Sequence, residues 1–339
     1  MTKRTQRFVF LGVTILVVGL GTGLVASYVG FPNLGLVGSD GPVELAYVPA
    51  DATVVAYADV REVMDSELRQ KLLKFSPGND ASADWFQTET GINIQTDVDR
   101  VVASMPTPNT GNPPRPLVLI RGRFDTSRIE SLIREKGGTV TDYNKQRVIS
   151  VNNEFGLAFV EPGLAAVGDL ASVKRAIDTK LSGSNVTSNA AIMRLVRDLD
   201  AGNAWAVADV QSVTNASLLP PEVKQQLPPV TWFAVSGRVS DGLEAVIRAE
   251  ARDEAAANNL RDVVRGFIAL ARMQAGQHPA LADLVNSVEL GGTGTTVSIA
   301  VSIPASMIDL LGAIRANQGR PTEQVPGAAA PRRKLPTTL

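Results

Sequence analysis

The single histidine of the chain, His278, is the first residue to examine for catalysis, because hydrolytic triads and histidine-based zinc sites use this side chain. It lies in the stretch AGQHPAL, between two expected helices, and Pro279 follows it. A lone histidine in this setting is typical of an exposed loop. The sequence has no cysteine, which excludes thiolate metal ligands, cysteine nucleophiles, disulfides and a cysteine-linked lipid anchor. We therefore expect no catalytic triad and no metal site.

Two aspartates offer a second kind of chemistry. Asp97 and Asp99 lie two residues apart, with Glu89 close in sequence, and would share one face of a strand. Such a pair could act as general acid and base, as in glycosidases. A solvated turn or sheet edge is the commoner setting, and the neighbouring Arg100 favours surface ion pairing. We expect these acids to be structural, so the sequence predicts no catalytic residue and no enzyme.

Two glycine-rich stretches have the composition of nucleotide-binding loops. A phosphate cradle needs a strand before it and a helix N-terminus after it. Residues 19–23, GLGTG, lie inside an apolar segment, and residues 291–296, GGTGTT, precede another strand pattern, VSIAVSI. The second stretch therefore predicts a hairpin turn, and no cofactor is expected. The net charge of −1, and basic residues that do not alternate with aromatic ones, argue against a nucleic-acid partner.

Residues 8–29 form an uncharged apolar segment of 22 residues. As a helix it would be roughly 33 Å long, enough to cross a hydrocarbon core of about 30 Å. Residues 1–7 carry three basic side chains, which places the N-terminus in the cytoplasm and the bulk of the chain outside, in the periplasm. A signal peptide cleaved near Ala26 or Ser27 is the alternative. With either a retained anchor or a cleaved signal peptide, the rest of the chain is exported.

Small residues recur every four positions in this predicted single-pass span of the cytoplasmic membrane. Gly19, Gly23 and Ser27 would lie on one face of the helix. Small side chains at this spacing let two membrane helices approach closely. They are our candidate packing residues for self-association.

The chain repeats one short pattern, AYADVREV at 56–63 and AVADVQSV at 206–213. Each copy predicts a strand that ends at an aspartate, followed by a helix. Asp59 and Asp209 would be the helix N-caps, because their carboxylates can accept hydrogen bonds from unpaired backbone N–H groups. A symmetric acidic pair across an interface is the alternative. Duplication of one module is the simplest cause of the repeat.

Other pieces recur in the same order, strand–helix, strand–helix and hairpin–helix. We therefore predict an α+β fold, with an N-terminal transmembrane helix followed by two similar modules of mainly antiparallel sheet with helices on one face. The predicted segments are a cytoplasmic basic segment 1–7, the transmembrane anchor 8–29, a linker 30–44, α+β module 1 at 45–185, α+β module 2 at 186–316 and a disordered Pro/Ala-rich tail 317–339.

Three tryptophans are the aromatic candidates for binding. Trp205 and Trp232 fall in expected strands of module 2, where they would line a cleft between the modules or fill the core. Trp85 and Phe86 form either a core plug or a binding patch. Clefts between domains are common ligand sites.

The stretches YVPADATVVAYADVREV, from residue 47, and FQTETGINIQTDVDRVV, from residue 86, resemble a group of bacterial single-span envelope proteins of unknown function. In that group a Pro-Ala-Asp-Ala opening leads into a strand that ends at Asp, and a Thr-Gly-Ile turn precedes an Asp-Val-Asp strand. The matching residues are 49–59, 90–92 and 97–99. The resemblance implies an exported, anchored α+β protein and brings no reaction with it.

The sequence thus favours a membrane-anchored, extracytoplasmic, non-catalytic interaction or scaffold protein, an accessory component of an envelope complex. Its expected partners are the membrane, crossed once, and a second protein or another copy of the chain. The alternative function is a carrier or sensor that binds a small apolar or envelope-derived ligand in the cleft between the modules.

Overall fold

A computed structural model describes residues 41–70, 87–88, 91–106, 115–152, 154–199, 202–210, 230–275 and 279–304. The predicted anchor with Gly19, Gly23 and Ser27 therefore lies outside the described residues, as do Trp85, Phe86, Glu89 and His278. In the described part, no helix is both long and apolar enough to cross a membrane.

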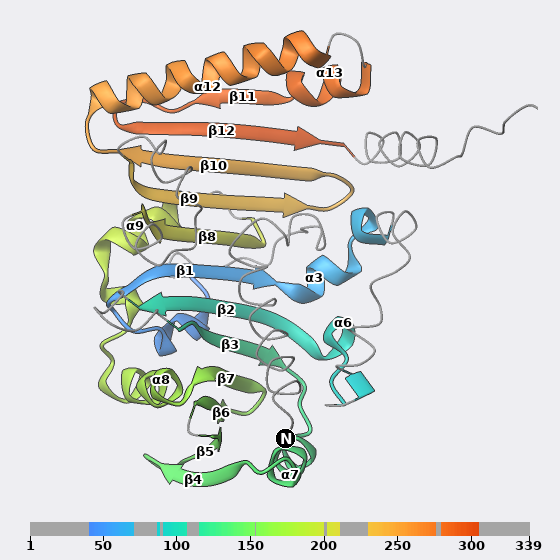
Figure 1. Cartoon of the computed structure of the whole chain (residues 1–339), viewed down its shortest axis with the longest axis vertical. Helices are drawn as coiled ribbons and strands as arrows, with labels where there is room; N and C mark the ends of the chain where they lie inside the picture. The colour runs from blue at the N-terminus through green and yellow to red at the C-terminus, as the bar shows by residue number, and fades with distance from the viewer. Residues whose placement is uncertain are drawn as a thin grey trace, which may run out of the picture.

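A single antiparallel sheet of twelve strands forms the centre of the described structure (Figure 1). The strands are β1 Ala52–Asp59, β2 Val98–Pro106, β3 Leu117–Gly122, β4 Thr139–Tyr143, β5 Gln146–Val151, β6 Phe155–Glu161, β7 Leu164–Asp169, β8 Ala204–Asp209, β9 Val230–Val239, β10 Leu243–Ala251, β11 Val288–Gly291 and β12 Thr296–Ile303. The predicted α+β class with a mainly antiparallel sheet is confirmed.

Short helical segments surround the sheet, and one helix is long. They are η1 Val43–Tyr47, α3 Val60–Asp65, α6 Ile94–Asp97, α7 Thr126–Glu135, α8 Leu170–Ser182, η2 Val186–Ser188, α9 Ala190–Asp198, α12 Glu254–Ala275 and α13 Pro279–Asn286. The long helix, α12, runs beside β11 at one end of the sheet (Figure 1).

The two copies of the repeated sequence pair with each other at the middle of the sheet. β1 and β8 run antiparallel, with Ala56 opposite Ala206 and Tyr57 opposite Trp205. From this pair the strand order is β1-β2-β3-β7-β6 in one direction and β8-β9-β10-β12-β11 in the other. The hairpin β4–β5 extends the first half beyond β6. One continuous sheet therefore joins the two predicted modules.

Helices cover both faces of the first half, so the expectation of helices on one face is wrong there. Neighbouring residues of β5 point to opposite sides, and Val148 belongs to one apolar cluster while Ile149 belongs to another. Val173 and Ile177 of α8 lie in the first cluster, whereas α7 packs against the second. The strands of this half are apolar at consecutive positions, which is the pattern of a strand buried on both faces.

The linker predicted over residues 30–44 ends earlier in the structure, because η1 is already part of the core. Glu44 and Leu45 are each 1% exposed. The boundary predicted between the modules, at residues 185 and 186, also packs into the core. The side chain of Val186 is fully buried, and its N–H donates to the carbonyl of Val48 at 2.8 Å. The ends of the first half are thereby held together.

Candidate functional site

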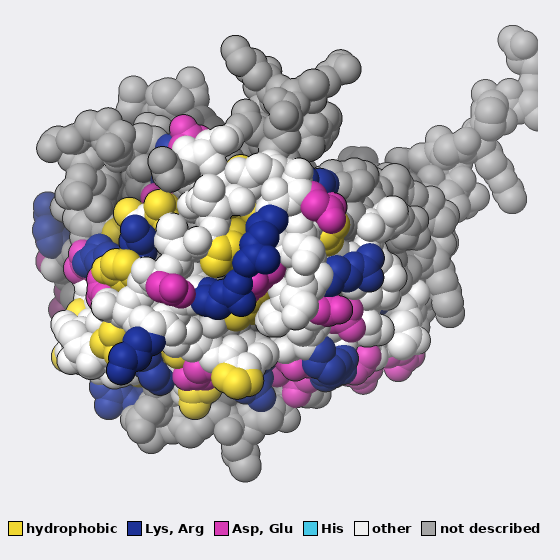
Figure 2. All heavy atoms as spheres, turned by 90° about the horizontal axis from the view of Figure 1, so that it is seen from below, with side chains coloured by type: hydrophobic (Ala, Val, Ile, Leu, Met, Phe, Trp, Pro, Cys, Tyr) yellow, Lys and Arg dark blue, Asp and Glu magenta, His cyan; other side chains and the backbone are white. Residues whose placement is uncertain are grey.

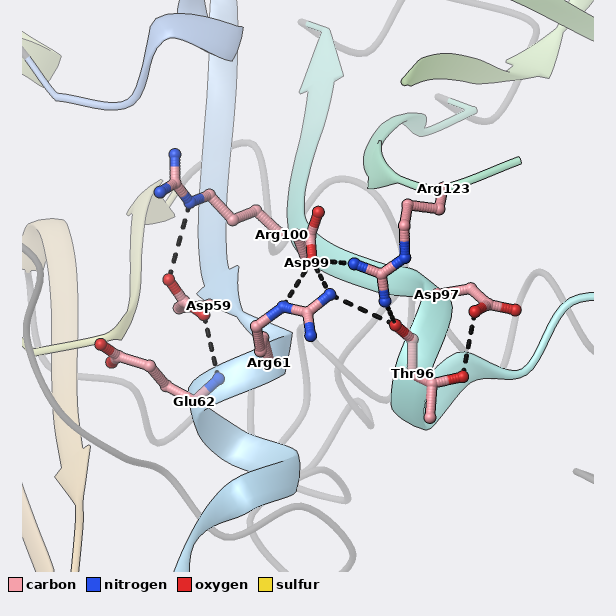
Figure 3. Close-up of polar contacts among 8 residues, drawn as sticks. All are labelled: Asp59, Arg61, Glu62, Thr96, Asp97, Asp99, Arg100 and Arg123. Carbon is pink, nitrogen blue, oxygen red and sulfur yellow. Dashed lines mark hydrogen bonds and ion pairs between the residues drawn. The ribbon is translucent and has the colours of Figure 1, made fainter. Parts of the chain in front are cut away.

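A cluster of charged side chains lies where β1 ends and β2 begins (Figure 3). Asp59 caps α3, since its Oδ1 accepts from the backbone N–H of Glu62 at 3.1 Å. Its other oxygen lies 3.6 Å from Nε of Arg100. Asp59 therefore serves both as a helix cap and as an ion-pair partner.

The two aspartates considered for acid–base chemistry both accept hydrogen bonds from neighbouring groups. Asp97 Oδ2 accepts from the backbone N–H of Asn93 at 2.9 Å. Asp99 Oδ1 accepts from Arg61 Nε at 2.6 Å, and Arg123 lies 3.9 Å from the same atom. Arg61 and Arg123 also both donate to the carbonyl of Thr96 (Figure 3). These contacts fasten α3 to the start of β2.

Glu62 is the one member of this cluster with a resolved pKa shift to near neutrality. Burial and the nearby Asp59 carboxylate raise the pKa of Glu62 to about 7. Its Oε2 accepts from Nδ2 of Asn203 at 2.9 Å, which links α3 to the residue before β8. Asn203 is 3% exposed, and its Oδ1 has no hydrogen-bond partner among the described residues. The contact therefore joins the two halves of the sheet through a titratable group.

We expect the stability of the protein to depend on the protonation of Glu62. The folded-state pKa of about 7 exceeds the usual 4.5, so the folded state binds more protons between these values. The stabilisation by protonated Glu62 is then lost as the pH rises through about 7. Glu62→Gln should be more stable relative to the wild type at about pH 8 than at about pH 5, measured by urea unfolding. The exposed Glu67→Gln is the control. An equal difference at both pH values would contradict the prediction.

A second charged network lies beside η1, and Glu44 is its buried member. Arg121 Nε of β3 donates to Glu44 Oε1 at 2.8 Å, and its Nη2 donates to Glu161 at 3.4 Å. Tyr47 donates to Glu161 at 2.8 Å, and Lys180 of α8 lies 3.5 Å from the same carboxylate. Burial raises the pKa of Glu161, but the hydrogen bonds from Tyr47 and Arg121 outweigh it and lower the pKa. The network holds the start of the described chain on the sheet.

A depression of about 400 Å³ lies on the second half of the sheet. Its floor follows the strand register. Trp232 of β9 is opposite Glu250 of β10, which is opposite Thr296 of β12, and the next row is Ala234, Arg248 and Ser298. An aromatic ring, two charges of opposite sign and two hydroxyl groups therefore lie side by side.

Two walls enclose this floor. On the β9 side, α9 contributes Arg194, Leu195 and Asp198, and on the β12 side the loop after β11 contributes Gly292 and Thr293. The guanidinium of Arg248 donates to the backbone carbonyl of Asp198, which ties the floor to the first wall. Thr295 and Thr296 each donate to the Glu250 carboxylate at 2.9 Å, which fixes its orientation.

The structure separates the two tryptophans that the sequence proposes as cleft residues. Trp205 is buried in the core and stacks on Tyr57 with ring centroids 5.8 Å apart. Trp232 is partly buried and lines the depression, which lies within the predicted module 2 rather than between the modules. Asp209 ends β8, and the residues that it was expected to cap lie outside the described part.

The long helix α12 carries a further candidate surface. Ala256, Ala257 and Leu260 pack against β10 and β12. Another set of apolar side chains on this helix is exposed, namely Val263, Phe267, Leu270 and Met273. We call these four residues the α12 stripe.

The described residues form no candidate metal centre, and the face drawn in Figure 2 has no large area of one charge. Among the described residues, no group of three His, Asp or Glu side chains is placed to hold a metal ion. At the end of the molecule formed by β4 and α7, basic and acidic side chains are interspersed with small hydrophobic areas (Figure 2).

Sequence reasoning found Trp232 but missed the other residues of the depression. Arg194, Arg248 and Glu250 lie in ordinary helix and strand patterns. The one available signal is that the charged residues of this strand, Glu244, Arg248 and Glu250, all lie at alternate positions, the pattern of a face that is not covered.

The chain matches no protein-family model, and no curated protein matches it in sequence. It is similar to solved structures of TP0453. Crystal form III matches with a TM-score of 0.47 and 10% identity over 79% of this chain and 97% of that chain. Crystal form IV matches with a TM-score of 0.46 and 10% identity over 80% of this chain and 96% of that chain.

Proposed function

We propose that the protein is a membrane-anchored, extracytoplasmic, non-catalytic interaction protein that serves as an accessory component of an envelope complex. The uncharged segment at 8–29 and the resemblance to bacterial single-span envelope proteins support the setting. The observation that carries the interaction role is the exposed α12 stripe. Phe267 is 68% exposed and Met273 is 73% exposed, although both are large apolar side chains.

The α12 stripe is the exposed continuation of an apolar side of the helix, because Val263 lies seven residues after the buried Ala256 and three after Leu260. Its members follow one another at spacings of four, three and three residues, so they lie along one side of the helix. Single exposed apolar residues are normal on protein surfaces, but contiguous ones mark interaction sites. The stripe therefore fits a partner surface.

The occupant of the α12 stripe is a protein partner with an apolar helix. Gly266 lies among the stripe residues, and a Cβ built on it would meet no atom within 4 Å. A bare backbone in this position allows another helix to approach closely.

A photo-crosslinking amino acid at Phe267 should give a discrete protein adduct in intact cells, whereas the same amino acid at Asn258 should not. Asn258 is exposed on the same helix and lies outside the stripe. Phe267→Asp should abolish recovery of the partner and leave stability within about 0.5 kcal/mol, since the side chain is exposed. The measurement is gel analysis followed by mass spectrometry. Adducts with lipid alone, or equal adducts at both positions, would contradict the proposal.

A duplication of one α+β module underlies this architecture in our proposal. Both halves use the same strand order from the central β1–β8 pair. Helices α7 and α12 follow equivalent strands, β3 and β10. The hairpin β4–β5 is then an addition to the first copy.

A carrier or sensor of a small ligand is the second candidate function. The observation that favours it is the depression of about 400 Å³ lined by Trp232, because sites for small ligands commonly measure about 300–1,000 Å³. The ligand would bind within module 2, on the floor formed by β9, β10 and β12.

A further inference from the structure

We propose that the depression around Trp232 binds a neutral saccharide. This inference rests on the second candidate function and names the class of ligand. It differs from the small apolar ligand that the sequence suggests, because most side chains lining the depression are polar. Three properties of the lining carry it: its charge balance, its hydrogen-bonding groups and its aromatic surface.

The charges of the depression cancel. Arg194 and Arg248 are cations, and Asp198 and Glu250 are anions. The charges alternate in the lining, because Arg248 and Glu250 lie two residues apart on one face of β10. Arg194 and Asp198 lie four residues apart on one side of α9. A phosphate or a carboxylate would therefore approach a carboxylate wherever it approached a guanidinium. Balanced charge of this kind favours an uncharged ligand with polar groups.

The lining offers both hydrogen-bond donors and acceptors. A carboxylate accepts about four hydrogen bonds, and Glu250 receives two, from the hydroxyl groups of Thr295 and Thr296. Its remaining lone pairs can accept from a ligand, while Arg194 and the Ser298 hydroxyl can donate. A sugar hydroxyl is at once a donor and an acceptor, so a polyhydroxylated ring can use all these groups.

Trp232 supplies a flat apolar surface beside these polar groups. Its side chain packs partly against the core, which limits its movement, and its remaining surface lines the depression. Indole has a large apolar body and a single N–H donor. The C–H face of a pyranose ring can stack on this surface while its hydroxyl groups reach Glu250, which is directly opposite on β10.

Saturation-transfer NMR on the full chain, in a detergent without a sugar head group, tests the proposal. The probes are maltose, trehalose and N,N′-diacetylchitobiose, with inorganic phosphate and glutamate as charged controls. At least one disaccharide should bind saturably, and the charged probes should not. Glu250→Gln should weaken that binding about tenfold through loss of hydrogen bonds to a charged acceptor. Glu244→Gln is the matched control, on the same strand but outside the lining.

A second variant tests the proposal independently, in case Glu250→Gln misfolds. Asp198→Asn, at an exposed position of α9, should also weaken binding without loss of helical signal. The proposal is wrong if none of the three disaccharides binds, if phosphate or glutamate binds in their place, or if neither variant changes the affinity. Native mass spectrometry distinguishes failure of the saccharide proposal from failure of the carrier function. A non-saccharide molecule that co-purifies keeps the carrier function and overturns the saccharide, whereas a clean apo mass without probe binding overturns both.

Discussion

Replacing Arg121 by Met is expected to lower the free energy of unfolding by roughly 3–5 kcal/mol, because it leaves a carboxylate buried without its countercharge. Glu44 is 1% exposed, and Arg121 is its only ion-pair partner among the described residues. The other oxygen of Glu44 has no hydrogen-bond partner within the described part, so no second contact compensates for the loss. Urea unfolding of the full chain measures the effect.

Two control variants separate this effect from a general loss of packing. The double variant Glu44→Gln/Arg121→Met has no buried charge. Its free energy of unfolding should therefore fall by about 0.5–3 kcal/mol less than the sum of the decreases in the two single variants. Arg175→Met removes an exposed ion pair with Asp51 and should cost about 0–1 kcal/mol. An Arg121→Met protein as stable as the Arg175→Met protein would show that Glu44 is not held by this contact.

The Glu44–Arg121 contact also bears on how the domain is attached. η1 is the first described element after the predicted anchor and linker, and its contacts reach β3, β6 and α8 through Arg121, Glu161 and Lys180. In the proposed membrane-anchored protein, tension between the membrane and the domain would reach the sheet at this network. A buried ion pair gives directional contacts at such a joint, which apolar packing alone does not.

Local patterns predicted many of the elements correctly. Apolar residues recur at spacings of three and four within residues 126–135 and 170–182, the pattern of an amphipathic helix, and these residues form α7 and α8. GGTGTT, predicted as a hairpin turn, joins β11 and β12. These signals depend on residues close in sequence. The sequence analysis did not predict the β4–β5 hairpin. Its turn residues, Asn144 and Lys145, both have positive φ, at 49° and 67°. A two-residue turn of this type usually contains Asn-Gly, and lysine in the second position conceals it.

The arrangement of the elements could not be predicted in the same way. The sequence repeat indicated two modules, but the pairing of β1 with β8 depends on which strand edges remain free once each half has folded. The face that α7 covers depends on the β4–β5 hairpin, with which it packs. The depression combines residues of α9, β9, β10 and β12, and only the cross-strand register brings Trp232, Glu250 and Thr296 into one row. Contacts so distant in sequence leave no local signal.

Labelling with a membrane-impermeant maleimide should place the domain outside the cytoplasmic membrane. The chain has no cysteine, so each introduced cysteine is unique. Asn258→Cys, at an exposed position of α12, should react in intact spheroplasts, and Thr5→Cys should react only after the membrane is permeabilised. Reaction of Thr5→Cys in intact spheroplasts, or protection of Asn258→Cys until lysis, would reverse the orientation.

Leu16→Arg should greatly reduce the labelling of Asn258→Cys, because it places a charge in the middle of the apolar segment 8–29. The cost of about 2.5–3.5 kcal/mol on insertion scales corresponds to roughly a hundredfold shift against insertion. Leu181→Arg, at an exposed apolar position of α8, makes the same change of side chain and should leave labelling unchanged. If Asn258→Cys is labelled equally in the Leu16→Arg and Leu181→Arg proteins, segment 8–29 is not required for export of the domain. The proposed envelope setting, on which both the α12 stripe and the depression depend for their partners, would then have to be abandoned.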